Sequence, residues 1–301
     1  RVGPHRRVRD IKTAAPSALR LRSLALAGAA WAACRSLIWP LGCPRAFLRG
    51  RRPGVAFAVS AMGAMGEHGG IACVFFDCDD CLYKNEWRTA GHLTRNINSY
   101  CMDVLGLPDG QAYELFKEHG TALRGLIKEN LMAESQVDEF LAKVHDVPLD
   151  DIQPDPELRE LIASVPYPIW VFTASIEEHA VKCLGKLGIL DLFEGRIISA
   201  SSRDMVKRCG DYVTKHDRRC FEVAMAVAGV PPEQAHRCVF FDDSTRNLKT
   251  AKEIGWRTVL VGLHARDTGE RITCAYADVS IDRIHEAREA IPEVFAQQPT
   301  Y

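Results

Sequence analysis

The sequence predicts an α/β protein with a doubly wound parallel β-sheet and a helical insertion after the first strand. Two observations lead to this fold class. From residue 69 onward, short β-prone runs alternate with helical stretches, which is typical of a parallel sheet with helices on both faces. Between Tyr83 and Val171 the alternation stops, and helical patterns follow one another without a convincing strand. We therefore expect a Rossmann-like core and a helical cap over the carboxyl end of its first strand.

The predicted strands are five runs rich in β-branched and aromatic residues: 71–76, 169–173, 196–199, 238–241 and 258–261. Helical patterns follow most of them, at residues 177–187, 221–228 and 246–254. The first of these ends at Gly188 and the last at Gly255, and glycine is common just after a helix. In the insertion, amphipathic helices are predicted at residues 94–105, 110–119 and 136–144, and residues 281–297 are predicted as a closing helix.

These elements divide the chain into three predicted parts. Residues 1–68 form a basic leader, residues 69–84 and 156–301 the core domain, and residues 85–155 the cap domain. A cap in this position excludes water from the end of the first strand and contacts the part of a ligand that is remote from the chemistry.

The leader differs in charge from the rest of the chain. Residues 1–60 hold twelve Lys and Arg against one acid, whereas the remainder holds 26 basic and 38 acidic residues. Such a basic, acid-poor segment is typical of an organelle-targeting peptide. Untranslated or artefactual sequence stays equally open, because Met62 and Met65 stand just before the globular pattern, and a disordered segment or an ordered extra domain is a further reading. We expect a chloroplast or mitochondrial location with a transit peptide, a cytoplasmic one otherwise, and an intracellular one in either case.

Composition excludes several classes of partner. The acidic body gives no electrostatic reason to bind nucleic acid, and the apolar residues 24–34 are too few to span a bilayer before Arg35 interrupts them. We therefore expect neither a nucleic-acid polymer nor a membrane as partner, while the oligomeric state stays open. The eleven cysteines are odd in number and scattered through apolar stretches, so we expect no disulfide framework.

One pair of cysteines, Cys78 and Cys81, has C-x-x-C spacing. Zinc needs two more ligands at matching spacing, and the sequence has no second C-x-x-C motif. We expect these side chains to pack beside the acidic turn, with a redox role left open.

Two apolar runs end on acidic pairs. Asp77 and Asp79 follow the first predicted strand, and Asp242 and Asp243 follow the fourth. The carboxyl ends of parallel strands meet at one edge of a sheet, where two acidic clusters repel each other unless a cation neutralises them. Carboxylate oxygens can hold this cation without any His or Cys ligand, which indicates magnesium rather than zinc. The alternative is two acidic turns that face water.

Two further positions suit a phosphate group. The strand at 169–173 ends on Thr173, followed by Ala174 and a helix start, where a hydroxyl and main-chain N–H groups can bind an anion. Lys215 precedes a predicted helix, where its ammonium can balance phosphate charge. Each signal is weak alone, because hydroxyl residues are ordinary helix caps and most lysines are solvated.

Taken in order, these residues resemble the four motifs of the haloacid dehalogenase-like superfamily. The matching segments are residues 77–83 (DCDDCLY), Thr173, Lys215 with Phe221 six positions later, and residues 242–247 (DDSTRN). More narrowly, the chain is similar to the pyrimidine 5′-nucleotidase branch, through residues 120–126, 144–145 with Leu149, 193–195 and 240–247. The resemblance covers about residues 71–290.

The resemblance implies a role for each motif residue. Asp77 is the expected nucleophile, which forms an aspartyl-phosphate. Asp79 is the expected general acid and base, and as an acid it has to start protonated. Thr173, with the adjacent Ala174, is expected to bind the phosphoryl group, and Lys215 to offset its charge and orient Asp77.

The resemblance also implies a magnesium ion. Asp77, the main-chain carbonyl of Asp79 and Asp243 are its expected ligands, with Asp242 helping directly or through water. The implied activity is magnesium-dependent hydrolysis of a small phosphate ester, with a pyrimidine nucleoside 5′-monophosphate as the expected substrate.

The sequence departs from the family pattern at three positions. Cys81 replaces the usual Thr of the first motif, Ala174 the Asn of the nucleotidase branch, and His216 the common Pro after the motif lysine. Two alternatives therefore stay open: a phosphatase for another small ester, such as a sugar phosphate or pyridoxal phosphate, and a non-catalytic binding member of the family. In the cap, Arg124 and His145 are candidates for substrate contact by position.

Overall fold

The computed structural model describes residues 70–266 and 268–295. The predicted leader at residues 1–68, and with it the expected location in the cell, lies outside the described residues. Within the described ranges, no helix is long and apolar enough to cross a bilayer.

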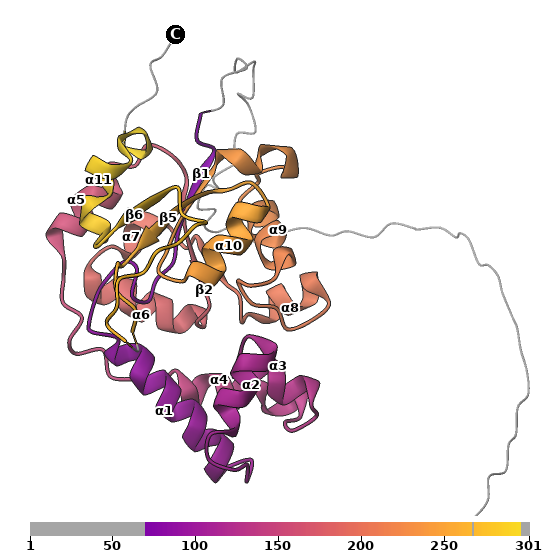
Figure 1. The fold of residues 1–301 in the computed structure, drawn as a ribbon. Helices are drawn as coiled ribbons and strands as arrows, with labels where there is room; N and C mark the ends of the chain where they lie inside the picture. Colours follow the sequence, from indigo (N-terminus) through magenta and orange to yellow (C-terminus); the bar gives the residue numbers. More distant parts are fainter. Residues whose placement is uncertain (1–69, 267, 296–301) are drawn as a thin grey trace, which may run out of the picture. The chain divides into compact units, whose positions relative to one another are not determined.

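The core is a six-stranded parallel sheet, which confirms the predicted fold class (Figure 1). The strand order is β3-β2-β1-β4-β5-β6, so the first strand in the chain lies at the centre of the sheet. The strands are β1 Cys73–Phe76, β2 Ile169–Thr173, β3 Ile197–Ser199, β4 Cys238–Asp242, β5 Arg257–Val261 and β6 Val279–Ile281.

Helices cover both faces of this sheet, and the alternation along β1 shows why the strand is apolar throughout. Val74 and Phe76 pack on one face, in the cluster that contains residues of α5 Pro156–Ala163, α6 Glu177–Leu187, α7 Leu190–Phe193 and α11 Ala287–Ala290. Cys73 and Phe75 pack on the other, with residues of α8 Arg203–Cys209, α9 Arg218–Val227 and α10 Thr245–Glu253. A central parallel strand buried on both faces has no polar side.

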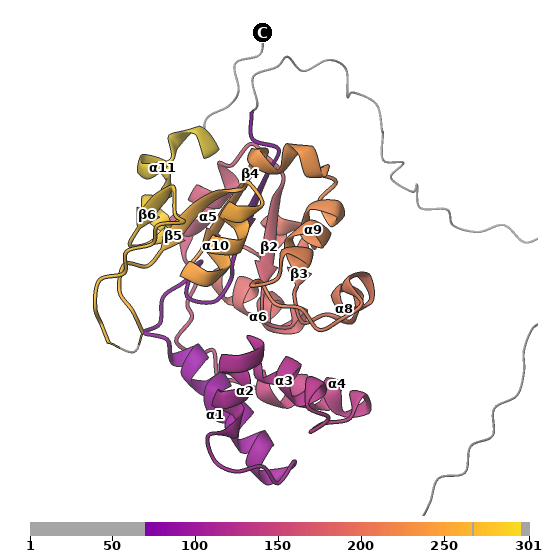
Figure 2. The ribbon, with the colours of Figure 1, turned by 45° about the vertical axis from the view of Figure 1, so that its right-hand side comes forward.

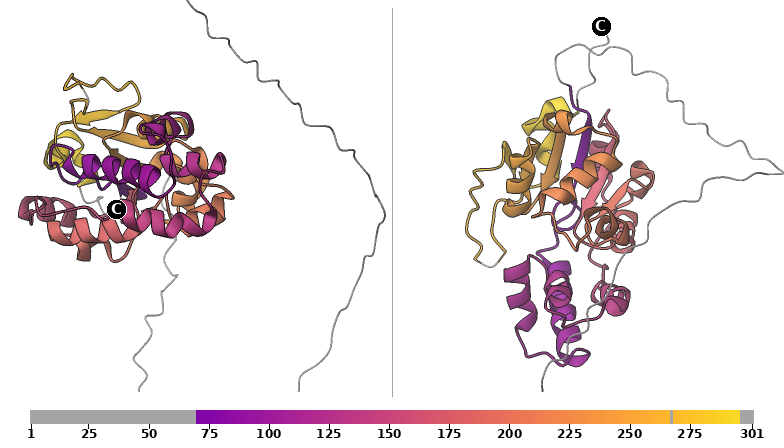
Figure 3. Two further views of the ribbon diagram at one scale, coloured as in Figure 1. Left: turned by 90° about the horizontal axis from the view of Figure 1, so that it is seen from below. Right: turned by 90° about the vertical axis from the view of Figure 1, so that its right-hand side faces the viewer.

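Besides α5, which packs on the sheet, four α-helices lie between β1 and β2 in the chain: α1 Arg88–Asp103, α2 Gln111–His119, α3 Ala122–Lys128 and α4 Val137–Val144. They share a hydrophobic cluster that includes Tyr100, Leu115, Leu126 and Phe140, and Tyr212 of the core also belongs to it. Figures 2 and 3 show these helices grouped together beside one end of the sheet. All four fall inside the range 85–155 that the sequence assigns to the cap, and the domain limits themselves stay predictions.

The closing helix expected at residues 281–297 is wrong. Ile281 instead ends strand β6, and short turns follow: η3 Ile284–Glu286, α11 Ala287–Ala290 and η4 Pro292–Val294. Buried side chains at Ile284, Ala287, Ile291 and Val294 have helix-like spacing, which explains the prediction. Pro292 has no N–H to continue a helix, so the segment breaks into separate turns.

Candidate active site

Strand register brings the polar strand ends together. Phe76 of β1 pairs with Val171 of β2 and with Phe241 of β4, so the residues that follow them emerge at one edge of the sheet. The N–H of Asp77 donates to the carbonyl of Phe241 (2.8 Å), which extends the β1–β4 pairing by one residue. Ligands of open α/β sheets bind at this carboxyl edge.

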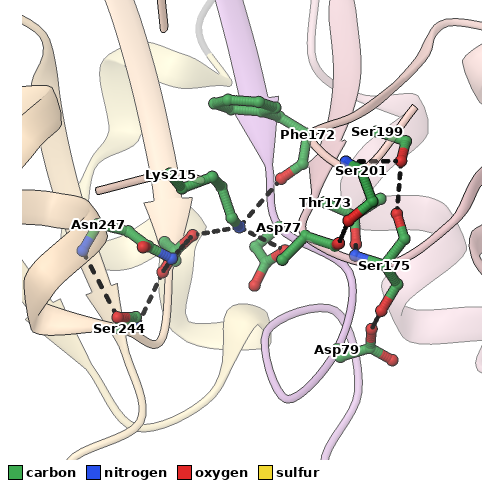
Figure 4. A network of polar contacts seen from close by, with 12 residues as sticks. Asp77, Asp79, Phe172, Thr173, Ser175, Ser199, Ser201, Lys215, Ser244 and Asn247 are labelled. Carbon is green, nitrogen blue, oxygen red and sulfur yellow. Dashed lines mark hydrogen bonds and ion pairs between the residues drawn. The ribbon is translucent and has the colours of Figure 1, made fainter. Parts of the chain in front are cut away.

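Lys215 joins the two acidic strand ends (Figure 4). Its Nζ lies 2.7 Å from Asp77 Oδ1 and 2.7 Å from Asp242 Oδ2, and it also donates to the main-chain carbonyl of Phe172 (3.1 Å). The lysine is 2% exposed and Asp242 is fully buried. Burial lowers the pKa of Lys215, but the carboxylates of Asp242 and Asp77 outweigh this effect and raise it above its usual range. The ammonium is therefore charged and fixed.

The start of α10 holds Asp242 in place. Asn247 Nδ2 donates to both carboxylate oxygens (2.9 and 3.1 Å), and the N–H of Ser244 donates to Oδ1 (2.8 Å). Ser244 is itself the N-cap of this helix, accepting from the N–H of Asn247. The DDSTRN segment thus supplies a carboxylate and the groups that orient it.

The residues around Lys215 include more carboxyl groups than positively charged groups. Carboxylate oxygens of Asp77, Asp242 and Asp243 lie within 4.8 Å of one another. Burial raises the pKa of Asp77 to about 7, with Lys215 opposing and Asp242 adding to the shift. Removal from water, with Asp242 and Asp77 nearby, raises the pKa of Asp243 well above its ordinary value. Three acids facing one ammonium, with oxygen donors only, fit a hard divalent cation.

The loop after β2 is held rigidly beside Asp77. The N–H of Ser175 donates to Thr173 Oγ1 (3.0 Å), Ser199 Oγ donates to the carbonyl of Ser175 (2.7 Å), and Ser201 Oγ donates to the carbonyl of Ala174 (2.7 Å). Figure 4 shows Thr173 close to Asp77, and the Ala174 side chain is exposed. The Ser175 N–H and hydroxyl are both engaged in hydrogen bonds, so the Thr173 hydroxyl, which accepts from Ser175 and can still donate its proton, is the group that this loop offers to an anion.

Asp79 is directed away from Lys215, toward Ser175 (Figure 4). It accepts hydrogen bonds from Tyr83 Oη (2.6 Å) and Ser175 Oγ (2.8 Å), and His179 Nε2 lies 2.8 Å from its Oδ1. Removal from water opposes ionisation, yet these contacts, that with His179 foremost, lower the pKa of Asp79 below its ordinary value. The expectation that Asp79 starts protonated is therefore wrong for this conformation, since three donors stabilise the carboxylate.

His179 carries the matching positive charge. Burial lowers its pKa, but the hydrogen bond to Asp79 and the contact with Cys183 raise it to about 10. Sequence reasoning missed His179 and Cys183, which stand at i and i+4 on α6 and so share a face. The H-x-x-x-C spacing in a helix that begins just after the second motif was the available signal.

The two cysteines of the C-x-x-C motif have separate surroundings. Both are buried in the core cluster. The Cys78 thiol contacts that of Cys183. Burial, with the charges of Asp77, Asp242 and Asp243, raises the pKa of Cys81 well above its usual value. Cys81 is thus a neutral thiol where the family has a hydroxyl.

The cap meets the core beside Lys215. Gly120 has φ +86°, and a Cβ built there lies 3.2 Å from His216 Nδ1 and 3.5 Å from Thr214 Oγ1, so the two loops are in close contact. Arg124 lies 3.5 Å from Asp211, a core residue, which also pairs with a lysine of α3. The candidate Arg124 is therefore engaged in a cap–core ion pair.

The other cap candidate, His145, lines a cavity of about 640 Å³ between α4, the start of α6 and the loop after β3. Its ring centroid is 5.7 Å from that of His179, and Ser201 lines the same cavity. Burial lowers the pKa of His145, so this ring is neutral at pH 7. Ile176, which follows the loop after β2, also lines this cavity, whereas Asp77, Thr173 and Lys215 do not.

Comparisons with known proteins agree with this geometry. Residues 71–255 match the family of haloacid dehalogenase-like hydrolases. Phosphate metabolism protein 8 of Saccharomyces cerevisiae is 29% identical over 202 residues, which cover 62% of this chain and 60% of that protein. The chain thus spans about 60% of the length of this relative. The nucleotidase branch is not tested by these matches and stays a prediction.

Partly similar chains are also found among solved structures. CbbY from Rhodobacter sphaeroides, in complex with phosphate, is 20% identical, with 75% of this chain and 100% of that chain covered and a TM-score of 0.49. The HAD-hydrolase YfnB from Bacillus subtilis, bound to magnesium, is 14% identical, with 73% and 98% covered and a TM-score of 0.45. The family match over most of the described core, together with the parallel sheet, identifies the chain as a member of the haloacid dehalogenase-like hydrolases.

Proposed function

We propose that this hydrolase is a magnesium-dependent phosphomonoesterase that forms an aspartyl-phosphate on Asp77. One observation carries the proposal: Lys215 is buried between Asp77 and Asp242 at 2.7 Å from each, with Asp243 in the same cluster. This arrangement fixes a carboxylate nucleophile and concentrates positive charge where a phosphoryl group gains negative charge. The name of the yeast relative, a phosphate metabolism protein, supports the same class of substrate.

Asp77 is oriented for attack. Lys215 holds its Oδ1, and among the described residues no hydrogen bond engages Oδ2. The free oxygen can therefore approach phosphorus while the other remains paired. Lys215 and the Thr173 hydroxyl would then bind the phosphoryl oxygens.

The acidic cluster would hold the magnesium ion. Asp77, Asp243 and the main-chain carbonyl of Asp79 are the proposed ligands, and Asp242 stays paired with Lys215 and Asn247. Bound there, the ion neutralises carboxylate and phosphate charge. Zinc is disfavoured at this position because its ligand set has oxygen donors only.

Asp79 has to change position to act as the general acid. In the described conformation its carboxylate is held by Tyr83, Ser175 and His179. On leaving these donors it loses the contacts that lower its pKa, and it approaches the Asp77 carboxylate, which favours the protonated form. Protonation of the leaving alkoxide is therefore coupled to this movement.

The substrate class we propose is a pyrimidine nucleoside 5′-monophosphate, on the basis of the resemblance to the nucleotidase branch. We propose that His145, which lines the cavity between α4 and α6, contacts the part of the substrate remote from phosphorus. Another small phosphate ester is the alternative, and a non-catalytic binding role is the remaining one.

Phosphate release tests the proposal. Uridine and cytidine monophosphates, sugar phosphates and pyridoxal phosphate are compared with Mg²⁺ and with EDTA. We expect turnover that requires Mg²⁺, falls at least about 10³-fold in Asp77→Asn, and is unchanged in Asp282→Asn, a surface aspartate paired with Lys84. Equal turnover in EDTA or in Asp77→Asn contradicts the proposal, and preference for a sugar phosphate or pyridoxal phosphate rejects the nucleotide assignment.

A further inference from the structure

Four side chains that are typical metal ligands meet behind the carboxylate of Asp79. Cys78 and Asp79 come from the loop after β1, and His179 and Cys183 come from α6. Ligand atoms of Cys78, Asp79 and Cys183 all lie within 4.8 Å of one another. His179 Nε2 lies 2.8 Å from Asp79 Oδ1 and 3.5 Å from Cys183 Sγ. We call these four residues the thiol–imidazole cluster.

The fold holds the cluster together. His179 and Cys183 stand one helical turn apart on α6 and so project from the same face. That face packs against the loop that follows β1, which brings in Cys78. The side chains of Cys78, His179 and Cys183 are at most 1% exposed, while that of Asp79 is 18% exposed. An ion can therefore reach the cluster from the side of Asp79.

One pair in the cluster has the spacing of a tetrahedral zinc site, although His179 is outside the group whose ligand atoms all lie within 4.8 Å of one another, so the imidazole has to move toward Cys78 when an ion binds. With Zn–S near 2.3 Å and Zn–N near 2.0 Å, tetrahedral sulfur and nitrogen ligands lie about 3.5 Å apart. The separation of Cys183 Sγ and His179 Nε2 is 3.5 Å. Nitrogen and oxygen ligands of zinc lie about 3.3 Å apart, so the Asp79 oxygen has to withdraw from His179 by roughly half an ångström.

The ligand atoms of the thiol–imidazole cluster determine which metal ion it would prefer. Two thiolates, an imidazole and one carboxylate favour zinc and are poor ligands for magnesium. The oxygen-only cluster of Asp77, Asp242 and Asp243 is the opposite case. The chain therefore has two adjacent candidate metal sites, one suited to a hard cation such as Mg²⁺ and one suited to Zn²⁺. Asp79 belongs to both, through its main-chain carbonyl in the first and its carboxylate in the second.

The surroundings of His179 indicate reversible binding. Metal-bound histidines usually donate their second ring N–H to an oxygen, which strengthens the site by about 10–100-fold. His179 Nδ1 is buried and has no hydrogen-bond partner among the described residues. The cluster lacks this support, which is expected of an inhibitory site rather than of a permanent structural one.

We propose that Cys78, Asp79, His179 and Cys183 form a reversible Zn²⁺ site that inhibits the enzyme by holding the Asp79 carboxylate away from the substrate. Binding displaces the thiol protons and the imidazole proton to solvent. The inhibition rests on the proposed role of Asp79 as general acid, whereas the binding site does not. A Cys78–Cys183 disulfide is the competing use of the same thiols.

Cobalt substitution tests the site without reference to activity. The full chain, reduced and metal-free, is titrated with Co²⁺, and the thiolate-to-cobalt charge-transfer band and the visible bands of tetrahedral cobalt are recorded. We expect one equivalent to bind and Zn²⁺ to displace it. Cys183→Ser and His179→Gln should weaken binding at least about tenfold, whereas Cys220→Ser, a buried cysteine of α9, should match wild type. Cys78→Ala replaces Cys183→Ser if that variant does not fold.

Two spectroscopic results would overturn the proposal. One is a wild-type titration without a thiolate band. The other is a band of equal strength and affinity in the Cys183→Ser or Cys78→Ala protein, which places the metal on other cysteines.

Inhibition separates the site from the proposed function. At saturating Mg²⁺, Zn²⁺ should inhibit the wild-type enzyme. The Cys183→Ser enzyme should need at least about a tenfold higher Zn²⁺ concentration for the same inhibition. A chelator should restore activity and a phosphine reductant should not. Relief by the reductant alone establishes the disulfide and overturns the zinc site, and equal sensitivity of Cys183→Ser overturns inhibition through Asp79. A cobalt band in a protein that hydrolyses no phosphate ester supports the site and rejects the proposed function.

Discussion

Replacing Lys215 with methionine should destabilise the metal-free protein by about 3–5 kcal/mol, because breaking a buried ion pair leaves an uncompensated charge. The Lys215 side chain is 2% exposed and lies 2.7 Å from both Asp77 and Asp242. Its loss leaves two carboxylates facing each other and removes a donor from the carbonyl of Phe172. Methionine has a similar length and packs adaptably, so it leaves little cavity. The loss of stability therefore measures the effect of removing the positive charge.

Urea unfolding at pH 7.5 in EDTA measures this effect. The control Lys249→Met, at a lysine 51% exposed and 3.9 Å from Glu253, should change stability by less than about 0.5 kcal/mol. Adding Asp242→Asn to Lys215→Met should recover about 1–3 kcal/mol, since one of the two unpaired carboxylates is then neutral. A loss below about 1 kcal/mol for Lys215→Met, or no recovery in the double variant, would refute the reasoning.

Three further predictions concern the same edge of the sheet. Gly120→Ala should lower the free energy of unfolding by about 1 kcal/mol more than Gly106→Ala does. Both glycines have positive φ, but only a Cβ at Gly120 meets a neighbouring side chain, that of His216. Urea unfolding measures the difference, and equal losses of stability exclude a close cap–core contact. Asn247→Ala should lower the free energy of unfolding by about 1–3 kcal/mol, because it removes two hydrogen bonds from buried Asp242. The loss should be smaller for Asn98→Ala, a half-buried asparagine whose bond to Asp109 is exposed to solvent, and similar losses for the two contradict this. In EDTA, burial raises the pKa of Asp77 to about 7, so the folded protein keeps a proton that the unfolded chain releases near pH 4. Wild type should therefore lose stability relative to Asp77→Asn as the pH rises from about 4 to 7, and parallel profiles in urea contradict the shift.

Much of the core could be predicted because its signals are local. The runs before Asp77 and Asp242 are apolar throughout, and only a strand buried on both faces needs such a sequence. Helix α6 ends where Gly188 takes the left-handed conformation, so its bounds, Glu177–Leu187, agree with the predicted ones. Strand β6 was missed because three residues at a sheet edge carry too little pattern.

The state of Asp79 could not be predicted for a different reason. Its hydrogen bonds to Ser175 and His179 join residues about a hundred positions apart, and these contacts decide its charge. The sequence predicted that Asp77, Asp242 and Asp243 come together, because the carboxyl ends of parallel strands meet at one edge of a sheet. Lys215 follows no strand, and its place beside them was expected from the family resemblance. The sequence did not show that Cys78 contacts Cys183, since that depends on which face of α6 meets the loop.

Chemical trapping of the intermediate tests the central claim most directly. The enzyme is mixed with substrate and Mg²⁺, quenched in acid, and treated with borohydride, which reduces an acyl phosphate to an alcohol; peptide mass spectrometry then locates the change. We predict reduction at Asp77, present only with substrate and Mg²⁺ and absent from the surface control position Asp282. Reduction at Asp79 or elsewhere, or phosphate release at full rate with Asp77 unmodified throughout turnover, would contradict the account.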